Sequence, residues 1–238
     1  MAGHNKWSKI KHKKAITDSK KGKAFTKLIK EITICAKESG GDPAHNAKLR
    51  MFLDKARDIN MPIENATRAI KKGTGELPGV SYEAHSYEGY GPGGIAILIE
   101  ALTDNKNRTI ASVRHAFTKH GGNVGESGSV NWMFQQLGSI KAEGKNVSED
   151  ELLEKLLDFD ISSLELNDET FYIHCSPKEL GTIKNIIENI GLKITEMELE
   201  WVAQNPMHLD EDTETKAVEL LSALEDLEDV QNVYTNLG

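Results

Sequence analysis

The sequence predicts an α+β fold in which an N-terminal three-helix module with a basic arm precedes two α+β domains, the last-inserted one ferredoxin-like. Three observations support this class. Helical periodicity runs from about residue 18 to residue 73, extended segments follow from about residue 80, and a strand–helix–strand–strand–helix–strand order begins near residue 138. The length of 238 residues exceeds that of a typical single domain. We expect three domains: residues 1–78, a discontinuous central domain of residues 79–135 plus 205–238, and residues 136–204.

Three helices are expected after a lysine-rich arm over residues 1–15. The first, over 18–38, has apolar residues at i, i+3, i+4, i+7 and i+11, namely Phe25, Leu28, Ile29, Ile32 and Ala36. Gly40-Gly41-Asp42-Pro43 ends it, and the second helix, 44–58, carries the stripe Leu49, Phe52, Leu53 and Ala56. In the third, Pro62 suits the first position, Ile63 and Ile70 stand one helical repeat apart, and Gly73 supplies the stop.

The central domain is expected to open with a hairpin. Residues 80–90 and 95–103 form its strands, and the turn is GYGPGG, residues 89–94. Asn107 can cap a helix that carries Ile110, Val113 and Phe117 and ends at Gly121. SVNWMF, residues 129–134, is a further strand candidate. We also expect an acidic helix over 212–227 and the tail 229–237 to return and complete this sheet, because the segment alone has too few elements to cover its faces.

The ferredoxin-like domain follows from the order of its elements. We expect strands over 139–143, 161–166, 170–175 and 192–202, and helices over 149–157 and 178–189. This order is that of the split βαβ arrangement.

Charge is distributed unevenly along the chain. The formal net charge is −8, yet ten lysines and a single aspartate occupy the first thirty residues. Residues 1–72 hold 18 Lys and Arg against 7 Asp and Glu, whereas residues 73–238 hold 11 against 30. A module of net charge +11 is therefore joined to a body of net charge −19. Such a basic run repels itself, so we expect a polyanion to neutralise it.

Other function classes find little support in the sequence. No apolar run reaches the length of a membrane span, and Cys35 and Cys175 stand far apart and are expected to be buried thiols. His115 and His120 are five residues apart, which separates them on a helix and favours surface or capping roles over a metal site. GYGPGG lacks the lysine and following helix of a phosphate-binding loop, so a hairpin turn is the favoured interpretation. We therefore predict no enzyme activity, no metal site and no cofactor.

The N-terminal run favours nucleic acid as the partner. Lysines pair with phosphates and gain from counterion release, and Trp or His rings can stack on unpaired bases. The alternatives are that the run is a solvated helix surface and that Trp7 folds back into the core. The predicted nucleic-acid-binding residues are Lys6, Trp7, Lys9, Lys11, His12, Lys13, Lys14, Lys20, Lys21, Lys23, Lys27, Lys30, Arg50, Arg57, Arg68, Lys71 and Lys72.

Several long motifs resemble one known family. They are MAGHNKWSKIKHKKA, GKAFTKLIKEI, NMPIENATRAIKKGTGE, YEGYGPGG, LTDNKNRTIASVRHAFTKHGGNVGESGSVNWMF and DVQNVYTN. In this order, they are similar to the YebC/PmpR family over nearly the whole chain, most strongly in residues 1–134. The resemblance implies a three-domain α+β protein, cytoplasmic in bacteria, described as a DNA-binding transcriptional regulator. A mitochondrial relative is described as a translational activator, which implies RNA or ribosomes as partners of some members.

Departures from the family pattern concern the arm. The family usually has Ser where Asn5 stands, and mixtures of Lys and Arg where this chain has Lys13, Lys14, Lys21 and Lys30. Lysine replaces the bidentate guanidinium fork by a point charge, which argues against base-specific recognition by the arm. Because the resemblance begins at Met1, we expect no transit peptide and a cytoplasmic location.

Two functions remain open on the sequence alone. The first is a non-enzymatic, DNA-binding regulator of gene expression, although residues 44–58, with Asn46, Lys48 and Arg50, show no convincing helix-turn-helix pattern. The second is a ribosome- or RNA-associated translation factor. It would insert the basic arm into ribosomal RNA while the acidic domains meet basic ribosomal proteins. No membrane partner is expected, and the oligomeric state is not predicted.

Overall fold

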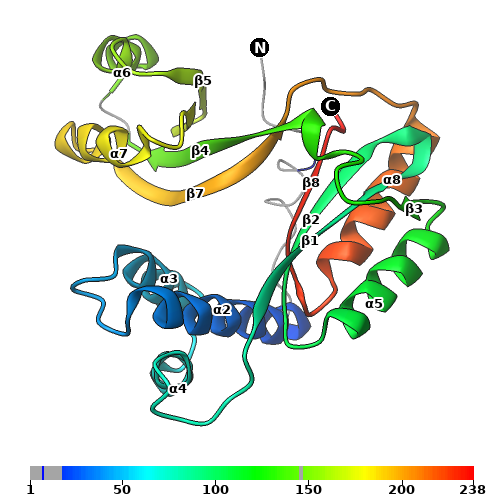
Figure 1. Ribbon diagram of the computed structural model, residues 1–238. Helices are drawn as coiled ribbons and strands as arrows, with labels where there is room; N and C mark the ends of the chain where they lie inside the picture. Colours follow the sequence, from blue (N-terminus) through cyan, green and yellow to red (C-terminus); the bar gives the residue numbers. More distant parts are fainter. Residues whose placement is uncertain (1–6, 8–17, 145–146) are drawn as a thin grey trace. The chain divides into compact units, whose positions relative to one another are not determined.

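The structure is a computed structural model that describes residue 7, residues 18–144 and residues 147–238 (Figure 1). The described residues fall into two compact units. Of the described residues, the larger unit contains 18–131 and Leu209–Val233, and the smaller contains Trp7, Trp132–His208 and Tyr234–Gly238. Each unit combines helices with a four-stranded sheet, which confirms the predicted α+β class. The proposed division into three domains stays a prediction.

Three helices begin the described part of the larger unit: α2 (Asp18–Ser39), α3 (Ala47–Asp58) and α4 (Ile63–Gly73). Their predicted apolar stripes meet in one cluster, in which Leu28, Ile32 and Leu49 are buried and Phe25, Phe52 and Leu53 pack around them. The second helix starts three residues later than predicted, because Asn46 caps it. The Asn46 side chain accepts a hydrogen bond from the Leu49 amide and donates to the carbonyls of Cys35 and Gly40, which ties α3 to the end of α2.

The sheet of the larger unit has the order β3-β1-β2-β8. Strands β1 (Glu83–Tyr90) and β2 (Ala96–Thr103) form the predicted antiparallel hairpin, with Tyr87 opposite Ile99. The short β3 (Asn123–Val124) pairs with β1, and β8 (Val230–Thr235) lies beside β2, so the prediction that the C-terminal tail completes this sheet is confirmed. Helices α5 (Lys106–Lys119) and α8 (Glu211–Glu225) lie side by side against it (Figure 1).

Two local predictions in this unit are wrong. Asn105, not Asn107, caps α5, and its side chain accepts a hydrogen bond from the Arg108 amide at 3.1 Å. The strand predicted over 129–134 is instead a 3-10 turn, Asn131–Met133, followed by the next strand at Phe134. The cause is Glu88, whose buried carboxylate accepts hydrogen bonds from the amides of Gly128, Val130 and Asn131 at 2.7–2.9 Å. The backbone wraps around this one side chain, and the amides that bind it are no longer available to pair with a neighbouring strand.

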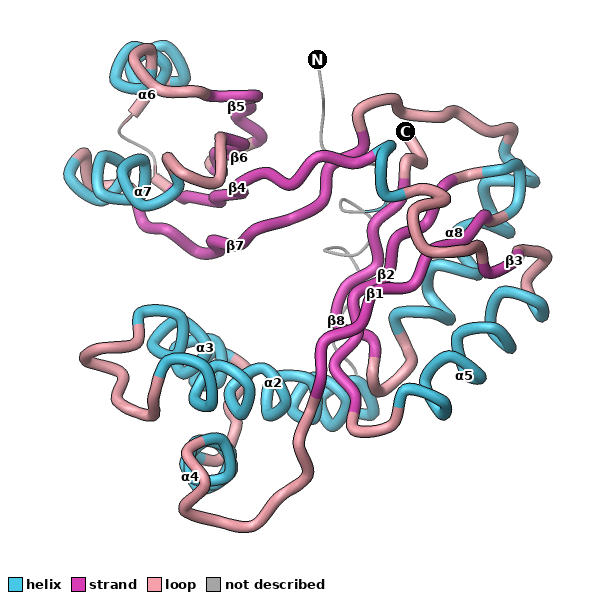
Figure 2. The backbone as a smooth tube through the Cα atoms, viewed as in Figure 1, coloured by secondary structure: helices cyan, strands magenta, loops and turns pink. Residues whose placement is uncertain are grey.

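The smaller unit has the predicted ferredoxin-like order of elements. These are β4 (Phe134–Glu143), α6 (Glu149–Leu156), β5 (Ile161–Asn167), β6 (Thr170–Cys175), α7 (Leu180–Asn189) and β7 (Lys193–Ala203). The sheet order is β5-β6-β4-β7 and all three strand pairs are antiparallel, which confirms the prediction (Figure 2). Buried residues from helices and strands form its core, among them Ile140, Leu152, Phe171 and Ile183.

Both cysteines are buried free thiols, as predicted. Burial, reinforced by Glu179 and Asp160, raises the pKa of Cys175 to about 11, so its thiol stays protonated near neutrality. Within residues 18–144 and 147–238, no helix combines the length and apolar character that a membrane span requires.

Candidate nucleic-acid interface

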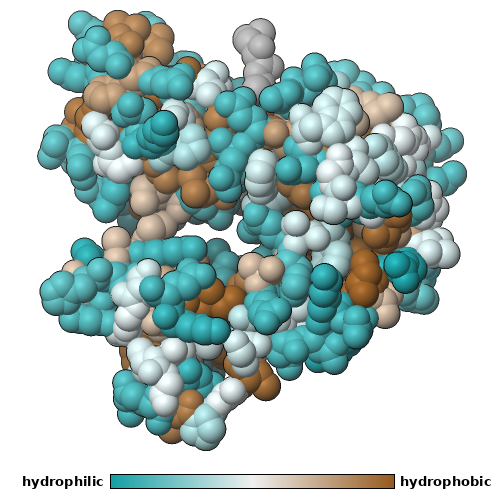
Figure 3. All heavy atoms as spheres, viewed as in Figure 1, coloured by the Kyte–Doolittle hydropathy of each residue, from teal (hydrophilic) through white to brown (hydrophobic). Residues whose placement is uncertain are grey.

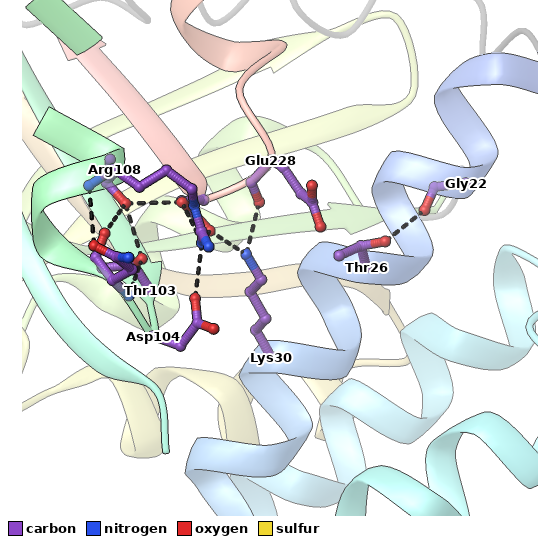
Figure 4. A network of polar contacts seen from close by, with 10 residues as sticks. Gly22, Thr26, Lys30, Thr103, Asp104, Arg108 and Glu228 are labelled. Carbon is purple, nitrogen blue, oxygen red and sulfur yellow. Dashed lines mark hydrogen bonds and ion pairs between the residues drawn. The ribbon is translucent and has the colours of Figure 1, made fainter. Parts of the chain in front are cut away.

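A buried carboxylate fixes α2 to the rest of the larger unit (Figure 4). Asp229, just before β8, lies 2.6 Å from the Lys30 ammonium of α2 and accepts further hydrogen bonds from Arg108 and Thr109 of α5. The same lysine donates to the Glu228 carbonyl at 3.1 Å, and its ammonium lies over the ring of Tyr82. Lys30 is only 4% exposed. This network sets the position from which the three N-terminal helices are presented.

The charge of Asp229 is stabilised despite its burial. Desolvation alone raises the pKa of this carboxyl, but hydrogen bonds from Lys30, Thr109 and Arg108 outweigh it and leave the pKa below the ordinary value of 3.8. The carboxylate is therefore ionised near neutrality. Its ionisation keeps a charged partner beside the buried ammonium.

The lysines of α2 that were predicted to bind nucleic acid turn partly toward the protein itself. Lys27 donates to the Glu225 carbonyl at 2.8 Å, and the exposed Lys23 lies 3.6 Å from Asp226. Together with Lys30, they line up along residues 225–229. Lys30 has its charge partner inside the fold, so we leave it out of the proposed interface.

On α3, the two predicted arginines are exposed but engaged locally. Arg50 donates to the carbonyls of Pro43 and Ala44, in the turn that precedes the helix. Arg57 is paired with Asp54, three residues earlier on the same helix. Exposed pairs of this kind contribute little to stability, typically about 0–1 kcal/mol, and exchange partners at small cost. Both guanidinium groups therefore remain available to a stronger anion.

On α4, three predicted residues gather on one face. Arg68, Lys71 and Lys72 are exposed and stand at i, i+3 and i+4, so their side chains neighbour one another. Like charges at this spacing destabilise a helix slightly, although Lys71 and Lys72, in the last turn, also complement the helix dipole. An external anion would relieve the repulsion and leave the dipole interaction in place. Among the described residues, this face is the most concentrated predicted site.

Helix α5 is a further basic element that the sequence prediction did not include, although Arg108 is already bound by Asp104 and Asp229. Its segment holds four basic residues, Lys106, Arg108, Arg114 and Lys119, and no acidic one. The basic character of this helix was hidden because charge was summed over all of residues 73–238, which gave a net of −19. A separate count of charge for each helix is the signal that could have found it.

Part of the predicted site lies outside the described residues. This holds for Lys6, Lys9, Lys11, His12, Lys13 and Lys14, and for the side chains of Lys20 and Lys21. Trp7 is described and is 3% exposed. Its burial favours the alternative in which the indole packs into the protein rather than stacking on a base.

A serine, a histidine and a glutamate form a row of polar contacts on the sheet of the smaller unit. His174 Nδ1 lies 2.9 Å from Ser163 Oγ, and its Nε2 lies 2.6 Å from Glu200 Oε1. The imidazole is buried, so a substrate cannot reach it in this conformation. We interpret the row as polar contacts that link strands. No group of three metal-ligating side chains occurs in the described part of the chain.

The GYGPGG turn packs against the start of α8. Gly93 and Gly94 both have positive φ, 72° and 81°. A Cβ atom built on Gly93 would lie 2.5 Å from a methyl group of Leu209 and 3.0 Å from one of Thr213. The turn therefore has a structural reason for its glycines.

Two domain models of one protein family match this chain, and together they span residues from both units. Residues 5–76 match the TACO1/YebC protein N-terminal domain, and residues 82–237 match the TACO1/YebC second and third domain. The chain belongs to the TACO1/YebC family. This confirms the resemblance seen in the sequence motifs.

Relatives in the TACO1/YebC family are named as regulators. A "probable transcriptional regulatory protein" of Chlorobaculum tepidum, CT1665, is 50% identical over 238 residues, covering 100% of this chain and 95% of that protein. One of Desulfosudis oleivorans is 48% identical over 236 residues, covering 99% and 96%. Among solved structures, the conserved hypothetical protein Aq1575 of Aquifex aeolicus superposes with a TM-score of 0.86 at 45% identity, over 98% of this chain and 96% of that one.

Proposed function

We propose that this TACO1/YebC protein is a non-enzymatic, cytoplasmic regulator of gene expression that binds nucleic acid through its N-terminal helical module. The observation that carries the proposal is the separation of charge, +11 over residues 1–72 and −19 over residues 73–238. A duplex lying along the whole protein would be repelled by the acidic body, so close approach is confined to the module. The names of the curated relatives support a role in transcription.

The exposed face of α4 is the part of this interface that variants can test most directly. Replacing Arg68, Lys71 and Lys72 together by Ala removes up to three phosphate-binding side chains without touching the buried cluster of the module. We expect the affinity for a random DNA duplex to fall and the slope of log affinity against log salt to flatten by about one for each phosphate that is no longer neutralised. Fluorescence anisotropy of a labelled duplex over a series of salt concentrations measures both quantities.

A matched control comes from the body. Replacing Lys178, Lys184 and Lys193 by Ala removes the same charge from the smaller unit and should leave both affinity and slope nearly unchanged. Equal losses of affinity in the two triple variants would show that binding follows net charge alone, and the assignment of the interface would fail.

A second candidate is a ribosome-associated translation factor, and the acidic body favours it. Ribosomal RNA can accept the arm while neighbouring basic proteins face the residues of net charge −19, and complementary charge on both parts selects one docking orientation. In this case the protein should co-sediment with ribosomes at low salt. Charge reversal at Lys9, Lys11, Lys13 and Lys14 to Glu should release it.

The two candidates give opposite results in paired measurements. A protein that stays in the supernatant and binds one promoter duplex at least about a thousandfold more tightly than random DNA is a specific transcriptional regulator. Co-sedimentation with no such preference supports the ribosomal role.

A further inference from the structure

Apolar side chains reach the surface of the smaller unit around α6 (Figure 3). Leu153 and Leu157, one helical turn apart, are 43% and 69% exposed. They border a groove of about 290 Å³, which Leu156, Phe159, Ile161 and Leu164 also line. We call this the α6 groove. Its only polar lining side chains are Glu149 and Ser163 among the described residues.

The surroundings of the α6 groove are strongly acidic. Residues 148–160 contain six Asp or Glu residues and one Lys. Asp150 and Glu154 are exposed and stand next to the Leu153 and Leu157 stripe on the helix, whereas Lys155 stands on another side. The apolar α6 groove is thus bordered by negative charge.

An apolar groove with an acidic border favours some binding partners and disfavours others. A second copy of the chain would bring an identical acidic border against the first, and like charges across an interface are costly. Nucleic acids and anionic membranes are repelled for the same reason. A drug-sized ligand fits poorly, because the groove lies at the lower edge of small-molecule pocket volumes and offers few polar groups to orient one.

We propose that the α6 groove binds a cationic amphipathic helix of another protein. Apolar side chains spaced one turn apart on that helix would enter the groove beside Leu153 and Leu157. Lysines or arginines that flank them would face Asp150 and Glu154. This is helix-in-groove recognition, in which apolar anchors supply affinity and charge supplies orientation. The site is separate from the nucleic-acid interface and does not depend on it.

A model peptide tests the proposal on the full-length protein. The probe is a labelled peptide of about fifteen residues with leucines at i, i+3, i+4 and i+7 and lysines at the other positions. A second peptide of the same composition, with its order scrambled so that no apolar face forms, controls for simple charge attraction. Fluorescence anisotropy gives both affinities, and we expect the amphipathic peptide to bind more tightly.

Protein variants then locate the binding. Leu157→Ser should weaken the amphipathic peptide about tenfold, because the variant no longer offers an apolar side chain to the peptide at this position. Glu154→Lys should weaken it and reduce its salt dependence. Leu199→Ser, which changes a similarly exposed leucine on β7, should leave the affinity within about twofold. Thermal unfolding and DNA affinity of each variant should match those of the parent, since Leu157 and Glu154 are exposed.

Three results would overturn the proposal. Equal binding of the scrambled peptide would reduce the effect to charge. An unchanged affinity in Leu157→Ser would place binding elsewhere. A dimer in gel filtration that Leu157→Ser dissociates would make a second copy the occupant.

Discussion

The carboxylate of Asp229 joins two helices that are far apart in the sequence. It binds Lys30 of α2 and Arg108 and Thr109 of α5, so each substitution in the network leaves a different group without its partner. Removing one member of a buried ion pair is strongly destabilising, because the other charge stays buried.

Substitutions at Lys30 and Asp229 should therefore differ in cost. Asp229→Asn should lower the free energy of unfolding by about 3 kcal/mol, because the ammonium of Lys30 loses its counterion. Lys30→Met should cost less, since Asp229 keeps Arg108 and Thr109. Urea unfolding of the full-length chain measures both. Lys23→Met, in an exposed pair, serves as the control and should change stability by less than about 1 kcal/mol; an equal decrease there would contradict the role of burial.

The same residue predicts a dependence on pH. Because the pKa of folded Asp229 lies below its ordinary value of 3.8, its contribution is fully present above about pH 4 and is lost as the pH falls through the folded-state pKa. The difference in unfolding free energy between the parent and Asp229→Asn should thus be constant near neutrality and shrink in acid. Urea titrations from pH 7 to about pH 3 follow it. A difference that grew in acid would refute the assignment.

At the scale of single residues, the sequence could not place this lysine. Lys30 stands among ten lysines in the first thirty residues, and lysine is almost never fully buried unless it is paired. Its partner is 199 residues away, and nothing local distinguishes it from its exposed neighbours. For Trp7, the sequence allowed two roles, base stacking and burial, because an aromatic ring suits both. The structure buries it.

At the scale of elements, the two glycines of the turn between β1 and β2 distinguish backbone strain from steric clash when a side chain is added. Gly94→Ala meets only the strain of positive φ and should destabilise by about 1 kcal/mol, whereas Gly93→Ala meets the same strain and a clash with Leu209. We expect a clearly lower thermal unfolding temperature for Gly93→Ala than for Gly94→Ala. Unchanged stability in both, with weakened nucleic-acid binding, would instead give the turn a role in ligand contact.

Periodicity predicted the elements well, and side-chain competition for backbone amides explains the failures. The helices of residues 18–73, the hairpin and the ferredoxin-like order all follow from hydrophobic spacing and Gly or Pro stops. The 129–134 segment has the composition of a strand, but Glu88 binds its amides from a position some forty residues earlier. Asn105 and Asn107 are both good caps by type, and only the structure distinguishes them.

For the whole molecule, the charge separation predicts how binding responds to salt. If roughly six basic groups of the module meet phosphates on a DNA duplex, log affinity against log salt should have a slope near −5. Anisotropy titrations from about 50 to 200 mM salt measure it. An affinity independent of salt would exclude the polyanion as the partner of residues 1–72, whatever its identity.

The position of β8, far along the chain from α2, has a consequence for synthesis on the ribosome. Lys30 emerges early, but Asp229 and β8, which completes the sheet of the larger unit, emerge only after the ferredoxin-like elements of residues 134–203. At a synthesis rate of roughly 5–20 residues per second, the buried lysine waits on the order of ten seconds or more for its counterion. The ferredoxin-like elements, which lie in the continuous stretch of residues 134–203, can fold during that interval. The N-terminal helices therefore remain unanchored on the nascent chain until Asp229 has left the ribosome.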